Sequence, residues 1–446
     1  MEFVSAGDTL AQRLADRSAK AGIIGLGYVG LPLARAAAKA GFTTIGFDID
    51  AAKVDLLNAG KSYIDAVSSE DLLAHVNSGQ FTASSDFDRL GECDVIAIAV
   101  PTPLSRQREP DLSFVVATAE EIATRLRPGQ LIVLESTTWP GTTEEVLKPI
   151  FERGDLVSGK DFYLAFSPER EDPGNKNFHT VTIPKIVAGE GEVASALVET
   201  FYGAVVDKVV AVSSPKVAEA VKITENVFRA VNIALVNELK VVYDAMGIDV
   251  WEVVDAAATK PFGYMPFYPG PGLGGHCIPI DPFYLTWKSR EFGLSTRFIE
   301  LAGEINVAMP RYVVSRLEQA LDRSQKVSLG AARVLVLGVA YKKNVADIRE
   351  SPSLELMEIL GGRGTEVIFH DPLIDSIPKT RAYGHFAGRA SVELTPQLLA
   401  AVNAVVVATD HDAVDYTLIA KNARLVVDTR NVFARKGIQA DIIVKA

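Results

Sequence analysis

Short apolar runs recur along the chain, separated by polar or helix-forming segments. The run at residues 21–24 precedes a glycine turn, an alanine-rich segment and a second apolar run that ends at Asp48. This order predicts a strand–helix–strand unit. Further strand-like runs lie at 93–101, 130–137 and 161–168, with helix-compatible segments between the first two. Strands that alternate with helices predict a doubly wound parallel sheet.

The pattern changes in the middle of the chain. Residues 215–247 contain few helix breakers and end in glycine, which predicts one long helix. Segment 260–282 is dense in proline and glycine, but aromatic and apolar residues stand between these breakers. Such a loop indicates a site rather than a linker. A second α/β pattern begins at 332–340.

The first predicted strand leads into a GxGxxG motif formed by Gly25, Gly27 and Gly30. The first glycine makes the turn, the second lets the backbone approach a pyrophosphate, and the third allows close helix packing. Asp48 stands 18 residues after Gly30, where a carboxylate accepts hydrogen bonds from the adenosine ribose. Because this carboxylate repels a 2′-phosphate, the motif predicts NAD rather than NADP, although Lys53 is placed to meet a phosphate. Glycines that serve only as turns are the alternative.

Polar residues follow two further strands at the edge where ligands bind in this fold. Pro101 and Thr102 end one predicted strand, and Thr137 ends another. Hydroxyls at such ends can orient a nicotinamide or a water molecule. Capping of the following segments is the alternative.

Lys222 and Asn226 stand four residues apart in the predicted long helix and therefore project from one face. Both side chains donate hydrogen bonds, so in a cleft they would stabilise an alcohol oxygen that becomes a carbonyl or an oxyanion. A solvated helix face is the alternative interpretation.

The two cysteines, Cys93 and Cys277, lie far apart, which argues against a disulfide framework. Cys277 lies in a glycine-rich loop, four residues before Asp281, and a thiolate can add to an aldehyde. A buried inert thiol is the alternative, and it is our interpretation of Cys93. His276 precedes Cys277 directly, without a CxxC pair, so we expect no metal site.

Charge and hydropathy narrow the classes of partner. The chain has 45 basic and 56 acidic residues, a net charge of −11 that repels polyanions, so we expect no nucleic-acid partner. No apolar run approaches the ~18 residues that cross a bilayer. The N-terminal region lacks the apolar core of a secretory signal, so we expect a cytoplasmic protein without membrane contact.

Several motifs follow one another in the order typical of a known family. They are GLGYVGLPLA, VPTP, STTWPGTT, SPEREDPG, the Lys222–Asn226 helix, GPGLGGHCIPIDP and GVAYKKNVADIRESP. From about residue 20 onward, the chain resembles the nucleotide-sugar 6-dehydrogenases, the family that contains UDP-glucose dehydrogenase. SPEREDPG and the cysteine loop resemble more narrowly the bacterial UDP-N-acetyl-D-glucosamine 6-dehydrogenases, which supply acidic sugars for surface polysaccharides such as O-antigen.

The resemblance implies roles for individual residues. Cys277 becomes the nucleophile, Lys222 and Asn226 stabilise the oxyanion, Asp281 and Thr137 position water, and Glu169 assists proton transfer. The implied cofactor contacts are Gly25, Gly27, Tyr28, Val29, Gly30, Asp48, Lys53, Pro101, Thr102, Thr137 and Arg349. The implied UDP-sugar contacts are Glu169, Arg170, Lys222, Asn226, Tyr268, Gly274 and Lys342.

One position departs from the UDP-glucose members, which have a second glutamate four residues after the first. This chain has Pro173 there, which favours a sugar other than glucose.

We therefore expect an α/β protein with two Rossmann-like doubly wound parallel sheets joined by a long central helix. The expected domains are an NAD-binding domain at 1–214, a helical domain with the cysteine loop at 215–320, and a UDP-sugar-binding domain at 321–446. Apolar residues on the long helix further predict a homodimer or higher homo-oligomer.

The leading functional hypothesis is four-electron oxidation of UDP-N-acetyl-D-glucosamine at C6 to the uronic acid. The same reaction on UDP-ManNAc, UDP-GalNAc or UDP-glucose is the nearest alternative. A two-electron hydroxyacid dehydrogenase and a non-catalytic NAD-sensing regulator are alternatives of other classes. The number of NADH molecules formed per sugar separates these classes: two, one or none.

Overall fold

The computed structural model divides the chain into two compact units. It describes residues 6–64, 66–105, 109–171, 178–275, 278–380 and 382–446. Unit 1 consists of Met1–Glu225 and Phe283–Ser295, and unit 2 of Asn226–Pro282 and Thr296–Ala446. Each unit has its own sheet and its own hydrophobic core.

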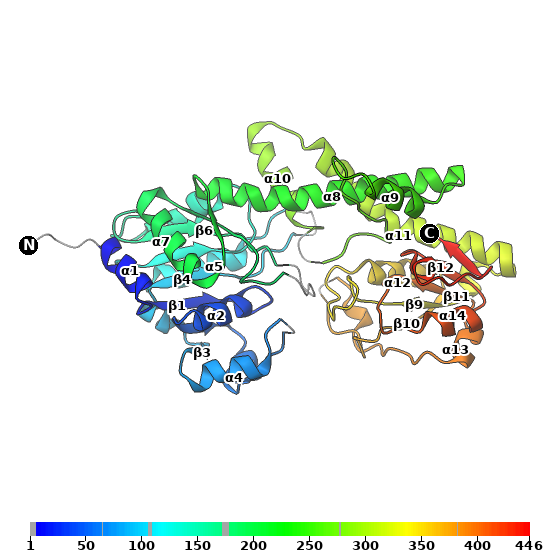
Figure 1. Ribbon diagram of the computed structural model, residues 1–446, viewed down its shortest axis with the longest axis horizontal. Helices are drawn as coiled ribbons and strands as arrows, with labels where there is room; N and C mark the ends of the chain where they lie inside the picture. The colour runs from blue at the N-terminus through cyan, green and yellow to red at the C-terminus, as the bar shows by residue number, and fades with distance from the viewer. Residues whose placement is uncertain (1–5, 65, 106–108, 172–177, 276–277, 381) are drawn as a thin grey trace, which may run out of the picture. The chain divides into compact units, whose positions relative to one another are not determined.

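Within its described residues, unit 1 is built on an eight-stranded sheet with the order β3-β2-β1-β4-β5-β6-β7-β8 (Figure 1). The strands are β1 Lys20–Ile24, β2 Thr43–Phe47, β3 Phe81–Ser84, β4 Val95–Ile98, β5 Leu131–Leu134, β6 Tyr163–Phe166, β7 Lys185–Gly189 and β8 Val209–Ala211. The first six strands have the Rossmann order. Every residue of β4, β5 and β6 is buried, as expected for parallel strands covered on both faces.

Helices cover this sheet. They are α1 Ala6–Ala15, α2 Gly30–Lys39, α3 Ala51–Asn58, α4 Ser69–Asn77, α5 Ser113–Ala123, α6 Lys148–Phe151 and α7 Gly191–Val205. Helices α1, α2 and α7 contribute to one core cluster, with α7 in contact with both α1 and α2. The predicted strands at 93–101, 130–137 and 161–168 are confirmed as β4, β5 and β6.

One strand pair departs from the expected parallel arrangement. Strand β7 pairs antiparallel with β6, through Ala165 with Gly189 and Phe166 with Ala188. A parallel neighbour requires a crossover, usually a helix, and the described residues between these strands contain none. The chain therefore reverses direction between β6 and β7.

The predicted long helix is confirmed as α8, Pro215–Met246, which contributes residues to both units. Proline occupies its first position, where the missing N–H costs nothing. Gly247 follows with a φ of 72°, a left-handed conformation that ends helices and favours glycine. Helix α10, Asp281–Ser289, likewise contributes to both units.

Unit 2 contains a five-stranded parallel sheet in the order β10-β9-β11-β12-β13, a second doubly wound arrangement. The strands are β9 Arg333–Leu337, β10 Glu366–His370, β11 Ala404–Val407, β12 Val426–Asp428 and β13 Ile443–Lys445. The further helices are α9 Val250–Ala258, α11 Arg297–Gln325, α12 Pro352–Gly362, α13 Pro396–Ala401, α14 Tyr416–Asn422 and α15 Val432–Arg435. Two core clusters pack on this sheet. The expected α/β class is confirmed.

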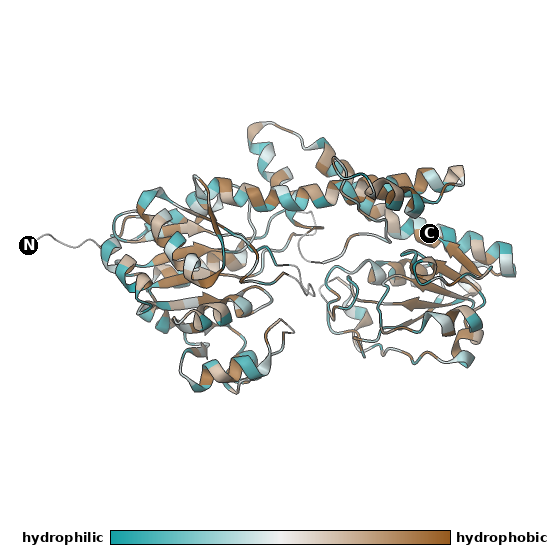
Figure 2. Cartoon of the chain, viewed as in Figure 1, coloured by the Kyte–Doolittle hydropathy of each residue, from teal (hydrophilic) through white to brown (hydrophobic). Residues whose placement is uncertain are grey.

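The colours of Figure 2 show the apolar strands of both sheets enclosed by helices with mixed surfaces. Across the part of the chain that the structure describes, no helix combines the length and the apolar character needed to cross a membrane.

Candidate active site

The glycine turn of unit 1 joins β1 to α2. Gly25 has a φ of 91°, and a Cβ atom there would lie 2.6 Å from the Ala99 carbonyl oxygen. A Cβ atom at Gly30 would lie 2.0 Å from the Gly25 carbonyl oxygen, whereas one at Gly27 would meet no atom within 4 Å. Packing thus requires two of the glycines, and the third leaves the backbone open at the N-terminus of α2. This opening fits the diphosphate of a dinucleotide.

Asp48 follows β2 beside this turn and is almost fully buried. Its Oδ2 accepts the Leu26 N–H at 3.1 Å and its Oδ1 accepts the Asp50 N–H at 3.0 Å. A carboxylate offers about four acceptor positions, so two remain for the ribose hydroxyls of a dinucleotide. The Nζ of Lys53 lies 4.0 Å from Oδ2. Tyr28, within the turn, is partly exposed.

The ends of β4 and β5 lie next to each other because these strands are paired. The Ser136 hydroxyl donates to the Val100 carbonyl at 2.7 Å and links the two ends. The Tyr284 hydroxyl donates to the carbonyl of the buried Thr102 at 3.0 Å. Thr137 is half-buried and Pro101 is exposed. These contacts fix the strand ends that the sequence assigned to the cofactor.

The segment after β6 docks on α8 within unit 1. The buried Lys222 ammonium donates a hydrogen bond to the Glu169 carbonyl. Arg170 donates to the Glu225 carboxylate at 2.5 Å and to the Pro184 carbonyl at 2.6 Å. The structure therefore brings Glu169, Arg170 and Lys222 together and adds Glu225 as a partner that the sequence did not indicate, whereas their contacts with the substrate stay predictions.

Glu171 is a carboxyl group that sequence analysis missed. The Glu171 N–H donates to the Glu169 carboxylate, and the Thr180 hydroxyl donates to the Glu171 carboxylate. Burial, and then the charge of Glu169, raise the pKa of Glu171 to about 8. The signal was present in the motif, where two glutamates stand two residues apart. Pro173, the position that departs from the UDP-glucose members, lies outside the described residues.

A buried ion pair lies in the same region. The Lys185 ammonium and the Glu135 carboxylate are 2.8 Å apart, and the Tyr202 hydroxyl donates to Glu135. Burial raises the pKa of Glu135, and the neighbouring Lys185 opposes this rise. Lys185 also lowers the pKa of Glu171, but burial and the charge of Glu169 outweigh this effect. Glu171 therefore retains its proton over part of the neutral pH range.

In unit 2, Asn226 of α8 and Asp281 at the start of α10 form a buried pair. The Asn226 Nδ2 donates to the Asp281 Oδ2 at 2.6 Å, and their exposed fractions are 3% and 2%. Cys277, the predicted nucleophile, and His276 lie outside the described residues.

The glycines just before the cysteine pack against the turn that contains Tyr341. A Cβ atom at Gly274 would lie 2.6 Å from the Cβ of Tyr341, and one at Gly275 would lie 2.9 Å from its ring. The Gly275 N–H donates to the Arg349 carbonyl at 3.1 Å. Glycine at both positions is therefore required for the loop to lie this close to the turn.

Three further predicted contacts belong to unit 2. Lys342 is half-buried. The Arg349 guanidinium binds the Asp347 carboxylate at 2.6 Å. The Tyr268 hydroxyl donates to Asp255 at 2.6 Å. Arg349 and Tyr268 thus have partners within their own unit, and their contacts with cofactor and substrate stay predictions.

Cys93 precedes β4 and is fully buried, with its Sγ 3.8 Å from the Arg89 carbonyl oxygen. Burial, followed by the charges of Glu92 and Asp94, raises its pKa to about 12. Such a thiol is protonated at neutral pH and does not react as a nucleophile.

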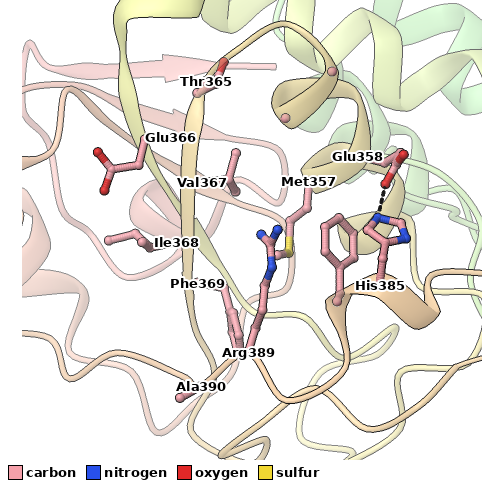
Figure 3. Close-up of a pocket in the computed structure, with 13 residues that line it drawn as sticks. Met357, Glu358, Thr365, Glu366, Val367, Ile368, Phe369, His385, Arg389 and Ala390 are labelled. Carbon is pink, nitrogen blue, oxygen red and sulfur yellow. Dashed lines mark hydrogen bonds and ion pairs between the residues drawn. The ribbon is translucent and has the colours of Figure 1, made fainter.

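A surface pocket of about 720 Å³ lies elsewhere in unit 2, beside the edge strand β10 (Figure 3). Its rim includes the ion pair of His385 and Glu358 at 2.6 Å. The Arg389 guanidinium lies 4.5 Å from the centre of the Phe386 ring. Among the residues that the structure describes, none of the predicted site residues lines this pocket. Volume alone therefore does not identify the reaction site.

Most of the chain matches the domains of one known protein family. Residues 19–206 match the NAD-binding domain of the UDP-glucose/GDP-mannose dehydrogenase family. Residues 216–308 match its central domain, and residues 335–435 match its UDP-binding domain.

Individual relatives differ in their substrates. A UDP-N-acetyl-D-glucosamine 6-dehydrogenase of Pseudomonas aeruginosa is 36% identical over 82% of this chain and 85% of its own length. An NDP-N-acetyl-D-galactosaminuronic acid dehydrogenase of Ralstonia nicotianae is 34% identical over 94% of this chain and 97% of its own. The structure of a UDP-D-ManNAc dehydrogenase from Pyrococcus horikoshii covers 96% of this chain and 98% of its own, with a TM-score of 0.84 and 31% identity.

The matched domains follow the same order as the structure: the glycine turn with Asp48 lies in the region that matches the NAD-binding domain, and most of the second sheet lies in the region that matches the UDP-binding domain. The chain belongs to the UDP-glucose/GDP-mannose dehydrogenase family and is an NAD-dependent nucleotide-sugar dehydrogenase.

Proposed function

We propose that the protein oxidises C6 of UDP-N-acetyl-D-glucosamine to a carboxylate, for the synthesis of a surface polysaccharide such as O-antigen or capsule. The choice of sugar rests on the SPEREDPG motif, on Pro173 and on 36% identity with a dehydrogenase of that name. The observation that carries the chemistry is the buried Asn226–Asp281 hydrogen bond of 2.6 Å. It holds a carboxylate and an amide together at Asp281, four residues after Cys277 in the sequence.

The proposed reaction takes four electrons in two steps. Bound NAD⁺ supplies the hydride acceptor for each step. The first oxidation removes a hydride from C6 and the hydroxyl proton, which Glu169 accepts directly or through water. The Cys277 thiolate then forms a C–S bond to the aldehyde, giving a thiohemiacetal. A second hydride loss gives a thioester, and water cleaves the C–S bond to release the carboxylate and the thiolate.

The other residues would stabilise charge and orient water. Lys222 and Asn226 donate hydrogen bonds to the oxyanion that forms at C6 in both addition steps. Asp281, held by Asn226, orients the attacking water together with Thr137. Glu171 is placed to tune Glu169, because its N–H donates to the Glu169 carboxylate.

The proposed cofactor and substrate contacts fall in different domains of the chain. The cofactor would lie along Gly27 and Asp48 in the domain at 1–214. The cysteine loop would belong to the domain at 215–320, and Lys342 would bind the UDP-sugar in the domain at 321–446.

A substrate panel tests the choice of sugar. UDP-GlcNAc, UDP-ManNAc, UDP-GalNAc, UDP-glucose and GDP-mannose are compared with NAD as the acceptor. We expect kcat/KM for UDP-GlcNAc to exceed each of the others by about tenfold or more, because a site that hydrogen-bonds one arrangement of the acetamido and hydroxyl groups leaves its polar groups unpaired with any other arrangement. A higher value for another sugar would transfer the assignment to that sugar.

We further propose a homodimer formed through α8. Phe228, Leu235 and Val242 repeat at seven-residue intervals, lie on one helix face and are 48%, 52% and 46% exposed. An apolar stripe of this kind is typical of a protein interface. Sedimentation at micromolar concentration should give a dimer, which Leu235→Asp should dissociate and Arg229→Asp, on an exposed position off the stripe, should not. A wild-type mass of 48.0 kDa would rule out the dimer.

A further inference from the structure

His411 is a buried histidine of unit 2 that has no role in the proposed reaction. Its side chain, just after β11, is 1% exposed. The ring lies between two partners: Nε2 is 3.2 Å from the Asp371 Oδ2, and Nδ1 accepts the Asn344 N–H at 3.0 Å.

These partners determine the form of the ring. A backbone N–H can only donate, so Nδ1 of His411 must offer a lone pair to Asn344. The proton of the neutral ring then lies on Nε2, from which it is donated to the Asp371 carboxylate. His411 therefore connects the end of β10 to the turn that contains Asn344.

The Asp371 end of this bridge is firmly held. Its Oδ2 also accepts the N–H groups of Val339 and Ala340, at 2.7 and 3.0 Å. Its Oδ1 accepts the Leu373 N–H at 2.9 Å. The histidine ring is thus anchored to a saturated buried carboxylate, and its Nδ1 presents an acceptor at a defined position.

The other end of the bridge is a turn with a conformation that needs support. Asn344 has a φ of 60°, in the left-handed region that costs energy for most residues. Its side-chain amide donates to Asp412 at 2.7 Å and accepts the Asp412 N–H at 3.0 Å. Lys343 forms an ion pair of 2.7 Å with the same aspartate. The part-buried bond to His411 and the exposed bonds to Asp412 together dock this turn.

We infer that His411 is a positioning residue of the nucleotide-sugar site, because its Nδ1 fixes Asn344 and thereby places Lys342 to bind the nucleoside diphosphate part of the substrate. This inference rests on the proposed function, in which Lys342 contacts the UDP-sugar. Tyr341 has a separate anchor, since its N–H donates to the Asp347 carbonyl at 2.9 Å. The packing of Tyr341 against Gly274 and Gly275 therefore survives loss of the histidine, and the effect falls on binding rather than on turnover.

Two substitutions separate the two ends of the bridge. In His411→Asn the amide oxygen takes the place of Nδ1 and still accepts the Asn344 N–H. In His411→Gln the amide nitrogen takes the place of Nε2 and keeps only the bond to Asp371. UDP alone is the probe in titration calorimetry, and steady-state kinetics give KM and kcat for the UDP-sugar and for NAD.

We expect His411→Gln to weaken UDP binding and raise the sugar-nucleotide KM by about tenfold, the effect of losing one hydrogen bond to a buried ring. Both kcat and the KM for NAD should stay within about twofold of wild type, and His411→Asn should retain UDP affinity within about threefold. Unchanged UDP affinity in His411→Gln would overturn the inference. So would equal losses in both variants, or a loss of kcat alone.

A third variant serves if both histidine variants fail to fold. Asp412→Ala removes an exposed partner of the same turn and should weaken UDP binding by about threefold, and unchanged affinity would contradict the inference. Failure of the proposed function has a different signature, since another sugar nucleotide of the panel would then be the preferred substrate, while the effect of His411→Gln on UDP binding would stay the same.

Discussion

Both sheets begin with a strand–helix–strand unit, and in each unit an aspartate follows the second strand. The two aspartates differ in the number of hydrogen bonds that they accept from the protein. Asp48 follows β2 and accepts two backbone N–H groups, from Leu26 and Asp50. Asp371 follows β10 and accepts three, together with the ring of His411. The first carboxylate has acceptor positions left for a ribose, whereas the second has none.

The turns after the first strands differ in the same way. In unit 1, residues 25–29 lead directly into α2, whose N-terminal amides can face a diphosphate. In unit 2, residues 338–351 separate β9 from α12 and form the turn with Lys342. The two sheets thus share a topology, and in the proposed function they bind their ligands through different groups: the first through backbone amides and an acid, and the second through the Lys342 ammonium on a braced turn.

The two cysteines also differ in their proposed roles, and substitution of Cys277 should have the largest effect on turnover. Cys277→Ser should lower turnover by about a thousandfold or more, because serine is a poorer nucleophile and an ester releases its acid more slowly than a thioester. A stoichiometric burst of NADH or a trapped ester should precede the slow phase, while NAD and UDP still bind. Cys93→Ser is the control and should change stability only. Wild-type turnover in Cys277→Ser would exclude covalent catalysis.

The glycine turn gives the next largest effect. Gly30→Ala places a Cβ atom 2.0 Å from a backbone oxygen, so we expect lower thermal stability and NAD affinity reduced by about a hundredfold. Gly27→Ala meets no protein atom within 4 Å and should leave the melting temperature unchanged while it weakens NAD binding. Calorimetry and thermal melts measure both variants. Equal NAD affinity in wild type and Gly27→Ala would show that the cofactor does not approach this turn.

The two acids test the comparison most specifically. Asp48→Asn should reduce the preference for NAD over NADP by about tenfold, with a smaller loss of stability than Asp371→Asn because Asp48 accepts fewer hydrogen bonds. Asp371→Asn should leave cofactor preference unchanged but lower the free energy of unfolding by about 2–3 kcal/mol, because it weakens hydrogen bonds to a buried charged acceptor. Kinetics with both cofactors and urea unfolding separate the two outcomes. An altered cofactor preference in Asp371→Asn would contradict the division between the sheets.

Sequence analysis predicted the elements whose signal lies in neighbouring residues. The glycine turn, Asp48 and α8 have such signals, in spacing and in the absence of breakers. The pairing of Asn226 with Asp281 joins residues far apart in the sequence, and only the resemblance placed both in one reaction. Nothing in the local sequence around His411 indicates that Asn344 and Asp371 lie on either side of its ring.

The direction of β7 and the burial of Glu171 could not be predicted from the sequence, for a related reason. Strand direction depends on how the chain crosses between strands, and the sequence between β6 and β7 contains no clear element that settles it. The pKa of Glu171 depends on the desolvation created by residues from other strands and helices. Such effects become visible only once the tertiary structure is known.

The smallest predicted effect concerns buried carboxyls with opposite pKa shifts. Burial would raise the pKa of Asp371, but hydrogen bonds from His411 and from backbone N–H groups outweigh it, so this pKa is lowered. The pKa of Glu171 is raised from 4.5 to about 8. Asp371 therefore contributes stability that is lost as the pH falls through its folded pKa. Glu171 contributes stability that is present at low pH and lost as the pH rises toward about 8.

Glu171→Gln should remove this second dependence. Relative to wild type, the variant should gain about 1–2 kcal/mol in unfolding free energy between about pH 5 and about pH 8. Urea unfolding at several pH values measures the difference, with Glu238→Gln on the exposed surface as the control. A constant difference across this range would mean that Glu171 is ionised throughout.

The most direct test of the central claim is the number of NADH molecules formed for each UDP-N-acetyl-D-glucosamine consumed, measured to completion by absorbance and by product analysis. The proposed cysteine mechanism predicts two NADH and the uronic acid as the sole product, because the aldehyde stays bound as a thiohemiacetal until its second oxidation. One NADH with free aldehyde, or consumption of sugar without NADH, would contradict it.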